Sequence, residues 1–449
     1  MDKLTRQIAS FASGLRFTDL TEEAVHCATQ RLVDAIGCAL GANDCEPSKI
    51  GRRLAVGQTP GKYAGRTLFA DDYFPLEMAG FINATMIRNY DFNDRFPGGH
   101  PSDGMGAHLA YAGANAVDGG RFLAAMVVTY EIFIRLSQSA NLRQHGWDQG
   151  FAVAISCAAG LCNLFGLSME QTAHAVGMTA TASVPLRVTR SGELTAWKNV
   201  ATAFAARNGA FAAQLAGEGL PGVLTAFEGR KGLFENITGP FEITPFNNEG
   251  GPFLIPQVLI KYWPVETNGQ PVVWAALEMR GKADPADIES IEVLSDEFTR
   301  FEIGSEPAKW DPRTRETGDH SLPYIFARAL VDGPITTASF EDGPLLDPAL
   351  RPLMAKITVT ADPEIEDMLP THMALRVNAR TKDGTVHRVE VIDPLGHPEN
   401  PMQDSDIERK FRAQAEPAIG AGRCGRVLDA WWNVRDANDL RPLIAMLDL

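Results

Sequence analysis

The chain has 449 residues, of which 45% are hydrophobic and 22% are charged, and its formal net charge is −15. This size predicts two to three domains, with cores large enough to need no disulfide or metal for stability. The acidic balance argues against binding to nucleic acid or to an anionic membrane, because both need a basic surface. An anionic substrate would therefore need a local cluster of Lys and Arg.

The sequence also predicts the cellular compartment of the protein. The N-terminal stretch has no long apolar run and no small-residue cleavage site, and no later stretch is apolar enough to span a membrane. The six cysteines form no C-x-x-C pair, and most lie in apolar helical patterns, as buried reduced thiols do. We therefore expect a cytoplasmic protein, because a reducing compartment suits free thiols.

Residues 1–265 are predicted to form a helical domain. Thr21 precedes two glutamates and an apolar pattern of helical spacing that runs to about Gly41. A Gly- and Pro-rich connector at 44–67, with room for a short helix, leads to an apolar helical segment at 75–90. Ser168 and Gln171 form a capping-box signature. The further helices are expected at about 106–117, 120–138, 149–165, 168–182 and 195–217.

Residues 266–397 are predicted to form a smaller α+β domain. Segments rich in β-branched residues predict strands at 288–294, 356–360, 373–379 and 386–392, and helical patterns are found at 268–281 and 321–332. The Asp383-Gly384 turn signal joins the last two strands as a hairpin. Residues 398–449 turn helical again and are expected to rejoin the first domain. The predicted fold class is mainly α, with a large helical domain formed by both chain ends.

The stretch from Asn89 to Asp103, NYDFNDRFPGGHPSD, concentrates ionisable residues between two predicted helices. Its glycines and prolines indicate a shaped loop, which rigid helices can hold as a catalytic site. One alternative is a structural loop of ordinary turn formers and helix caps. Another is a metal site, although the Asp-x-x-Asp spacing matches no ligand pattern of defined geometry. Its ligands would be Asp91, Asp94, His100 and Asp103.

Two lysines stand out further along the chain. Lys198 opens an apolar helix, at the end where the helix dipole disfavours a cation. Lys261 lies between aromatic residues in IKYWP. The alternative for each is a side chain that extends its ammonium group into solvent. Arg187 and Arg190 add positive charge shortly before Lys198.

The segment ETGDHSLPY at 316–324 is another candidate. His320 and Tyr324 are four residues apart near a predicted helix start, with Ser321 as its cap, so that His320 can orient Tyr324. The alternative is a capped histidine in the core.

Several motifs, in this order, resemble those of the MmgE/PrpD family, which is typified by 2-methylcitrate dehydratase. They are HPSD at 100–103, GWDQG at 146–150, GELTAWKNVATAFAARNG at 192–209, FEGRKGLF at 227–234, IKYWP at 260–264 and ETGDHSLPY at 316–324. The similarity extends from RLVDAIGCALGA at 31–42 to NPMQDSDIERKF at 400–411. Each motif alone is modest, and the ordered set is specific. The family also includes cis-aconitate decarboxylases and an iminodisuccinate epimerase.

The resemblance implies a helical domain, a smaller lid domain, a site between them, a homodimer, and neither metal nor organic cofactor. It implies a catalytic set on family positions: Asp91, His100, Lys198, Lys261 and Tyr324. We expect substrate contacts from a second set: Arg95, Ser102, Asp103, Gln149, Arg190 and His320. Two residues depart from the family pattern. Arg95 stands where Thr is usual, and Gln149 stands where relatives often carry His.

The expected activity is cofactor-independent dehydration of a 2-methylcitrate-like di- or tricarboxylate. His100 is the candidate general acid/base, because the ordinary pKa of a histidine is near neutral. Asp91 would orient it or act as a partner base, while Lys198, Lys261 and Arg95 bind substrate carboxylates. Epimerisation of a dicarboxylate such as iminodisuccinate and decarboxylation of a cis-aconitate-type acid remain alternatives. So do a metal-dependent hydrolase and a helical interaction protein without chemistry.

Overall fold

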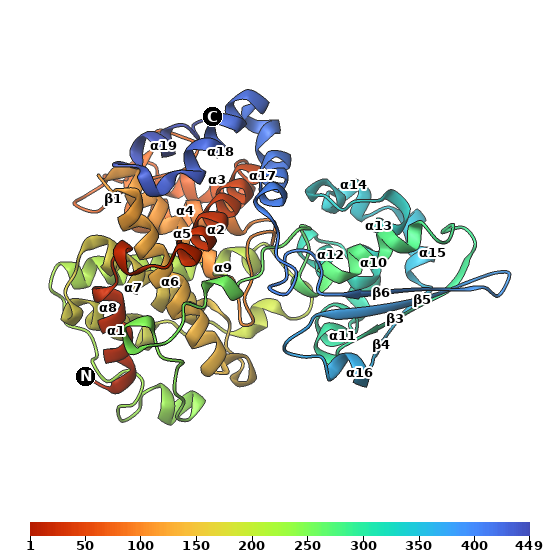
Figure 1. The fold of residues 1–449 in the computed structure, drawn as a ribbon, viewed down its shortest axis with the longest axis horizontal. Helices are drawn as coiled ribbons and strands as arrows, with labels where there is room; N and C mark the ends of the chain where they lie inside the picture. The colour runs from red at the N-terminus through yellow and green to blue at the C-terminus, as the bar shows by residue number, and fades with distance from the viewer.

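The computed structural model describes all 449 residues and contains two large hydrophobic cores. The larger core takes residues from Leu4 to Ile260 and again from Met402 to Leu447. The smaller core takes residues from Trp263 to Val389. Figure 1 shows a helical part and, beside it, a part that contains the four-stranded sheet. The predicted class, mainly α with a smaller α+β part, is confirmed.

The helical part forms because small residues allow its helices to pack closely. Gly106 illustrates this, since a Cβ added there would lie 2.2 Å from the backbone nitrogen of Ala84. Thr21 and Ser168 cap their helices as predicted, and Gln171 completes the capping box. The helices are α1 (Lys3–Gly14), α2 (Glu22–Gly41), α3 (Glu46–Ala55), α4 (Leu76–Arg88), α5 (Met105–Ala114), α6 (Gly119–Ser139), α7 (Gly150–Phe165), α8 (Met169–Ala182) and α9 (Trp197–Gly217).

The sheet of the second part has the strand order β4-β3-β5-β6. Its strands are β3 (Ile288–Ser295), β4 (Ile357–Ala361), β5 (Ala374–Thr381) and β6 (Val386–Ile392). Strands β3 and β4 are parallel, and the other two pairs are antiparallel. The β5–β6 hairpin turns at Gly384, whose φ of 87° is accessible to glycine, as the Asp-Gly signal predicted. Helices α10 (Gln270–Arg280) and α13 (Leu322–Asp332) belong to this part.

The C-terminal helices pack on the N-terminal ones (Figure 1). They are α17 (Asp404–Ile419), α18 (Ala421–Trp432) and α19 (Arg441–Ala445). Buried Lys410 on α17 forms an ion pair with buried Asp34 on α2, at 2.5 Å. The same ammonium donates a hydrogen bond to the carbonyl oxygen of Phe92 at 2.7 Å and lies over the Phe92 ring. Helix α17, near the end of the chain, therefore supports the charged loop.

Sequence patterns missed two features. Helix α1 begins at a cap made by Asp2, whose side chain accepts a hydrogen bond from the backbone N–H of Thr5. The connector carries a short antiparallel pair, β1 (Ala64–Arg66) and β2 (Tyr73–Pro75), as well as α3. Three-residue strands carry too little periodicity to be recognised in a sequence. None of the helices is both long and apolar enough to cross a membrane.

Replacing Lys410 with Met should destabilise the protein, because the substitution leaves the buried carboxyl of Asp34 without its cation. The expected loss in the free energy of unfolding is about 3 kcal/mol, measured by urea denaturation. Arg409→Met is the matched control, since the Arg409 side chain is 62% exposed and its ion pair with Asp406 contributes less than about 1 kcal/mol. Equal losses in both variants would contradict a structural role for the Lys410 contact.

Candidate active site

The charged loop joins α4 to a short 3₁₀ helix, Pro101–Gly104, and hydrogen bonds to three of its carbonyl oxygens fix its shape. The Nζ of Lys261 donates to the carbonyl of Asp91 at 2.7 Å, and Lys410 donates to the next carbonyl. The Nδ1 of His100 donates to the carbonyl of Asp94 at 2.6 Å. These contacts hold Asp91 at a φ of 48°, a left-handed conformation that is unfavourable for a non-glycine residue.

The Asp91 carboxylate is buried and lies among three cations. Arg88 forms an ion pair with its Oδ1 from one turn earlier on α4. Lys261 lies 3.0 Å from Oδ1, and Lys198 lies 3.2 Å from Oδ2. Burial acts to raise the pKa of Asp91, but the three cations together hold this pKa well below its usual range. Asp91 is therefore a permanent anion and a weak base.

The two lysines are fully buried, so the alternative of solvent-exposed ammonium groups is wrong. Lys198 occupies the unfavourable first turn of α9 because Asp91 supplies the compensating charge. Neither lysine lines the cavity beside Asp91. The nearest anion to both ammonium groups is Asp91. The lysines therefore influence the cavity indirectly, by compensating the negative charge of Asp91.

His100 lies beside the same carboxylate. Its Nδ1 donates to a carbonyl, so this nitrogen carries a proton, and its Nε2 lies 3.4 Å from Oδ1 of Asp91. Burial and the nearby Arg88 and Lys261 bring the pKa of His100 well below its usual value. The imidazole is therefore neutral at pH 7, with an Nε2 lone pair that can accept a proton. Asp91 would stabilise the resulting imidazolium.

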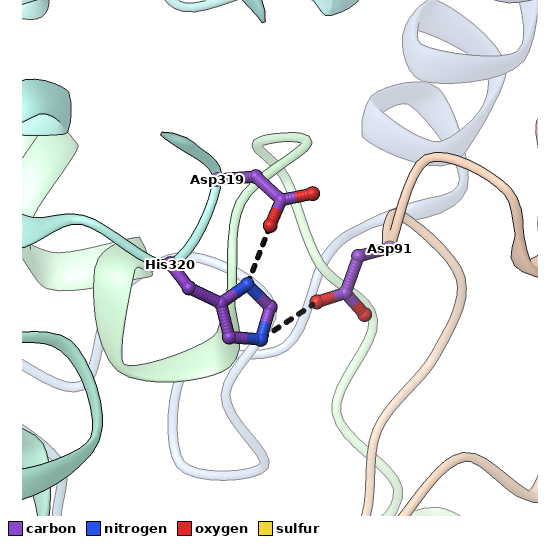
Figure 2. Close-up of side chains that lie close together, drawn as sticks. All are labelled: Asp91, Asp319 and His320. Atoms are coloured by element: carbon purple, nitrogen blue, oxygen red, sulfur yellow. Dashed lines mark hydrogen bonds and ion pairs between the residues drawn. The ribbon is translucent and has the colours of Figure 1, made fainter. Parts of the chain in front are cut away.

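A second imidazole reaches Asp91 from the smaller domain. Figure 2 shows the ring of His320 between Asp319 and Asp91. Its Nδ1 lies 2.5 Å from Oδ1 of Asp319, and its Nε2 lies 3.8 Å from Oδ2 of Asp91. Burial and the ammonium of Lys198 lower the pKa of His320 well below its usual value. Burial raises the pKa of Asp319 to about 6, although Lys198 opposes this shift. His320 thus has the carboxylate partner that orients catalytic histidines.

The cavity in front of these groups is rich in arginine. Its lining includes Arg88, Arg95, Arg143, Arg187 and Arg190, together with Gln149 and both histidines. Its volume is about 40 Å³, which is room for roughly three water molecules. This volume is smaller than that of a tricarboxylic acid.

Contacts join the two parts of the molecule beside the cavity. Arg187 of the helical part forms an ion pair with Glu302 on α11 (Glu297–Ile303). The guanidinium of Arg143 lies over the ring of Phe298 on the same helix, 5.6 Å from its centroid. Helix α11 therefore forms one wall of the site.

The predicted site residues other than Tyr324 fall into three groups. Those that line the cavity are Asp91, Arg95, His100, Gln149, Arg190 and His320. Lys198 and Lys261 lie behind Asp91. Ser102 and Asp103 are fully buried and do not line the cavity, and Ser102 donates to Asp94 at 2.6 Å.

The predicted pairing of His320 with Tyr324 is wrong. The hydroxyl of Tyr324 donates to the carbonyl oxygen of Ser339, and Tyr324 does not line the cavity. The predicted cap is correct, since the side chain of Ser321 accepts a hydrogen bond from the backbone N–H of Tyr324. His320 precedes the helix and Tyr324 lies within it. Two residues four apart share a face only when both are helical, because the helical period applies only within the helix.

Sequence reasoning missed several residues of the site, among them Arg88, Asp319 and Arg143. Arg88 stands three residues before Asp91, a spacing at which charged side chains can pair. Asp319 directly precedes His320, and this adjacency was a usable signal. Arg143 stands three residues before the GWDQG motif, but no local pattern marks it as a site residue.

The four residues of the sequence-based metal hypothesis do not form one ligand set. Asp94 accepts hydrogen bonds from Ser102 and Tyr130, and Asp103 accepts one from Asn93. A different trio, Asp91, Asp319 and His320, has its ligand atoms within 4.8 Å of one another. Both oxygens of Asp91 already face ammonium or guanidinium groups. This environment favours an anion over a metal cation.

Together, these features define a two-domain protein with a cluster of buried ionisable residues where the two parts meet. The MmgE/PrpD N-terminal domain model matches residues 6–245, and the MmgE/PrpD C-terminal domain model matches residues 263–434. The chain belongs to the MmgE/PrpD family.

Several named proteins are similar to this chain at low identity. The 2-methylcitrate dehydratase of Cupriavidus necator is 28% identical, over 82% of this chain and 80% of the relative. The enzyme of the same name from Escherichia coli is 29% identical over the same shares. The cis-aconitate decarboxylase-like protein oryM of Aspergillus oryzae is 26% identical, over 99% of this chain and 97% of the relative.

Anion binding in the cavity should weaken as the pH rises through 8. Burial lowers the pKa of Lys261 to about 8, although Asp91 opposes this shift. The ammonium is therefore charged below pH 8 and neutral above it. Calorimetry with tricarballylate should show an affinity about tenfold lower at pH 9 than at pH 7.

Lys261→Arg should keep its charge at pH 9 and remove most of this dependence. The control is Lys282→Arg, at a side chain that is 39% exposed. An affinity that is independent of pH in the unmodified protein would contradict the assignment.

Proposed function

We propose that this protein is a cofactor-independent hydro-lyase that dehydrates a 2-methylcitrate-like tricarboxylic acid or a related acid. The observation that carries this proposal is the approach of two neutral imidazoles to one ionised carboxylate, at the wall of an arginine-rich cavity. Such a site can bind a carboxylic acid and move a proton beside its carboxylate. The names of the relatives support the same substrate class.

The proposed reaction balances with the protein's own groups. The Nε2 of one imidazole removes the proton on the carbon beside a substrate carboxylate. The electron pair of that C–H bond forms the C=C bond, while the C–O bond breaks. The hydroxyl group takes a proton from the second imidazole and leaves as water. A bound polyanion raises the pKa of both imidazoles, so that one of them can carry the proton this step needs.

The two histidines differ in the group that contacts Nδ1 of the ring. At Nδ1, the imidazolium of His320 is stabilised by the carboxylate of Asp319, whereas that of His100 has a backbone carbonyl as its partner at this nitrogen. We assign the first proton abstraction to His320 and protonation of the leaving group to His100. Asp91 lies between both Nε2 atoms and stabilises whichever imidazole is charged. The cations behind Asp91 stabilise the negative charge that develops on the substrate carboxylate.

Two alternatives use the same residues. Epimerisation of a dicarboxylate such as iminodisuccinate needs one imidazole to remove the proton and the other to return it on the opposite face. Decarboxylation of a cis-aconitate-type acid needs a proton donor for the carbon that loses CO₂. A metal-dependent hydrolase is less compatible, because Asp91 is already surrounded by cations. An interaction protein without chemistry would gain little from so many buried charges.

We propose that the protein is a homodimer that pairs through α9. Trp197, Phe204 and Phe211 follow each other at intervals of seven residues and are 50%, 39% and 50% exposed. This spacing puts them on one face of the helix, and such a contiguous apolar stripe marks an interface. A stripe along one helix is self-complementary about a two-fold axis.

The cellular role follows from the proposed substrate. A 2-methylcitrate-type reaction belongs to propionate catabolism. All six cysteines are free in the structure, and free thiols suit a reducing compartment such as the cytoplasm.

The test of the function is a screen of 2-methylcitrate, citrate, cis-aconitate and iminodisuccinate, followed by NMR in D₂O. Dehydration creates a C=C bond and an olefinic signal, while epimerisation exchanges one proton for deuterium without water loss. Decarboxylation releases CO₂. Lack of turnover with all four acids would reject the proposal, and loss of activity after chelation would favour the metal alternative.

His100→Ala and His320→Ala should each lower kcat by about two orders of magnitude or more, because each removes a proton-transfer group. Asp319→Asn should lower kcat less and shift the acidic limb of the pH profile. The control is His26→Ala, since the His26 side chain is 53% exposed. Near-wild-type turnover in either active-site variant would remove that histidine from the mechanism.

The double variant Phe204→Glu and Phe211→Glu should be a monomer, because it places charges in the apolar stripe. Light scattering after size-exclusion chromatography gives the mass directly. The control is Phe301→Glu, at a side chain outside α9 that is 64% exposed. A wild-type monomer, or a dimer that survives the double substitution, would reject this interface.

A further inference from the structure

Two of the five arginines that line the cavity have no carboxylate partner. Three are neutralised within the protein, in the ion pairs Arg88–Asp91, Arg187–Glu302 and Arg190–Asp148. Arg95 and Arg143 form no ion pair in the structure. Arg95 donates only to the carbonyl oxygen of Gly99, at 3.1 Å, and Arg143 lies over the Phe298 ring.

These two guanidinium groups line the same small cavity. Burial, followed by the charge of Arg143, lowers the pKa of Arg95 to about 9. Burial, followed by the charge of Arg187, lowers the pKa of Arg143 to about 10. Both therefore remain positive at neutral pH. The cavity also holds one acid without an ion pair, Glu266, and its Oε2 accepts a hydrogen bond from the backbone N–H of Asn268 at 2.6 Å.

The fold holds Arg95 rigidly. Its backbone N–H donates to the carbonyl of Leu259 at 2.7 Å, and its carbonyl accepts from the N–H of Leu259 at 2.8 Å. This isolated bridge ties the loop to the strand-like segment that also carries Lys261. The side chain is 8% exposed. A buried cation at a fixed position that forms no ion pair within the protein can bind an anion from outside it.

We propose that Arg95 and Arg143 form a second carboxylate-binding site, separate from the Asp91 cluster, which makes the enzyme selective for acids with at least two carboxylates. Neither guanidinium forms an ion pair with Asp91, so both can bind a carboxylate without breaking the ion pairs of Asp91. Arginine is suited to this role because its planar fork binds a carboxylate through two hydrogen bonds. The inference rests on the proposed function and narrows its substrate class.

The test compares two ligands that differ by one carboxylate, glutarate and monomethyl glutarate, by calorimetry on the full-length protein. The unmodified protein should prefer glutarate. Arg143→Met should weaken glutarate binding about 10- to 100-fold and leave the ester's affinity nearly unchanged. Arg207→Met is the matched control, because Arg207 stacks on Phe204 of α9 and does not line the cavity.

Arg95 needs a second variant, because its hydrogen bond to Gly99 also holds the loop. Arg95→Met should lose the preference for glutarate, while Arg95→Lys keeps the charge and should retain part of it. The proposal is overturned if the unmodified protein binds both acids equally or binds neither. It is also overturned if Arg143→Met weakens both acids to the same extent or weakens neither.

Binding does not require turnover, so the outcomes separate the two proposals. If Arg143→Met loses the preference for glutarate but the protein converts no acid, the carboxylate site is supported and the proposed reaction is rejected. Normal turnover of a tricarboxylate with an unchanged preference in Arg143→Met would keep the reaction and reject this site.

Discussion

The ionised carboxylate of Asp91 is the interaction on which the site depends. Its charge brings together Arg88 from α4, Lys198 from α9 and Lys261 from the segment that leads into the smaller domain. Each of these cations would be unfavourable in the interior without that anion. The same carboxylate faces both imidazoles. One side chain thus organises elements that are more than 200 residues apart in sequence.

The protein has a net negative charge, but the charges around the cavity are mainly positive. A net charge of −15 gives an anionic ligand an unfavourable field at long range, but salt screens that field beyond about 10 Å. Inside the cavity the balance is reversed, because five arginines line it and two lysines lie behind Asp91. A small acid that reaches the cavity therefore encounters a positive potential, in spite of the overall composition.

Much of the fold could be predicted from sequence, because it follows from local rules. Caps at Thr21 and Ser168 and the Asp-Gly turn define their elements through neighbouring residues. The site was only partly predictable. The loop and the buried lysines are marked by unusual residues in their local context, whereas the contribution of Arg143 depends on how distant segments pack. The failure at Tyr324 has the same origin, since its hydroxyl turns to Ser339 within the smaller domain.

The division of the imidazoles between two domains has a kinetic consequence. His100 belongs to the helical part and His320 to the smaller one, and Phe298 and Glu302 of α11 line the same cavity as both rings. The proposed reaction uses both rings, so it requires the two parts of the molecule to be in contact. Under that proposal, a movement that separates the two parts would stop the chemistry, and product release can then limit the rate of turnover.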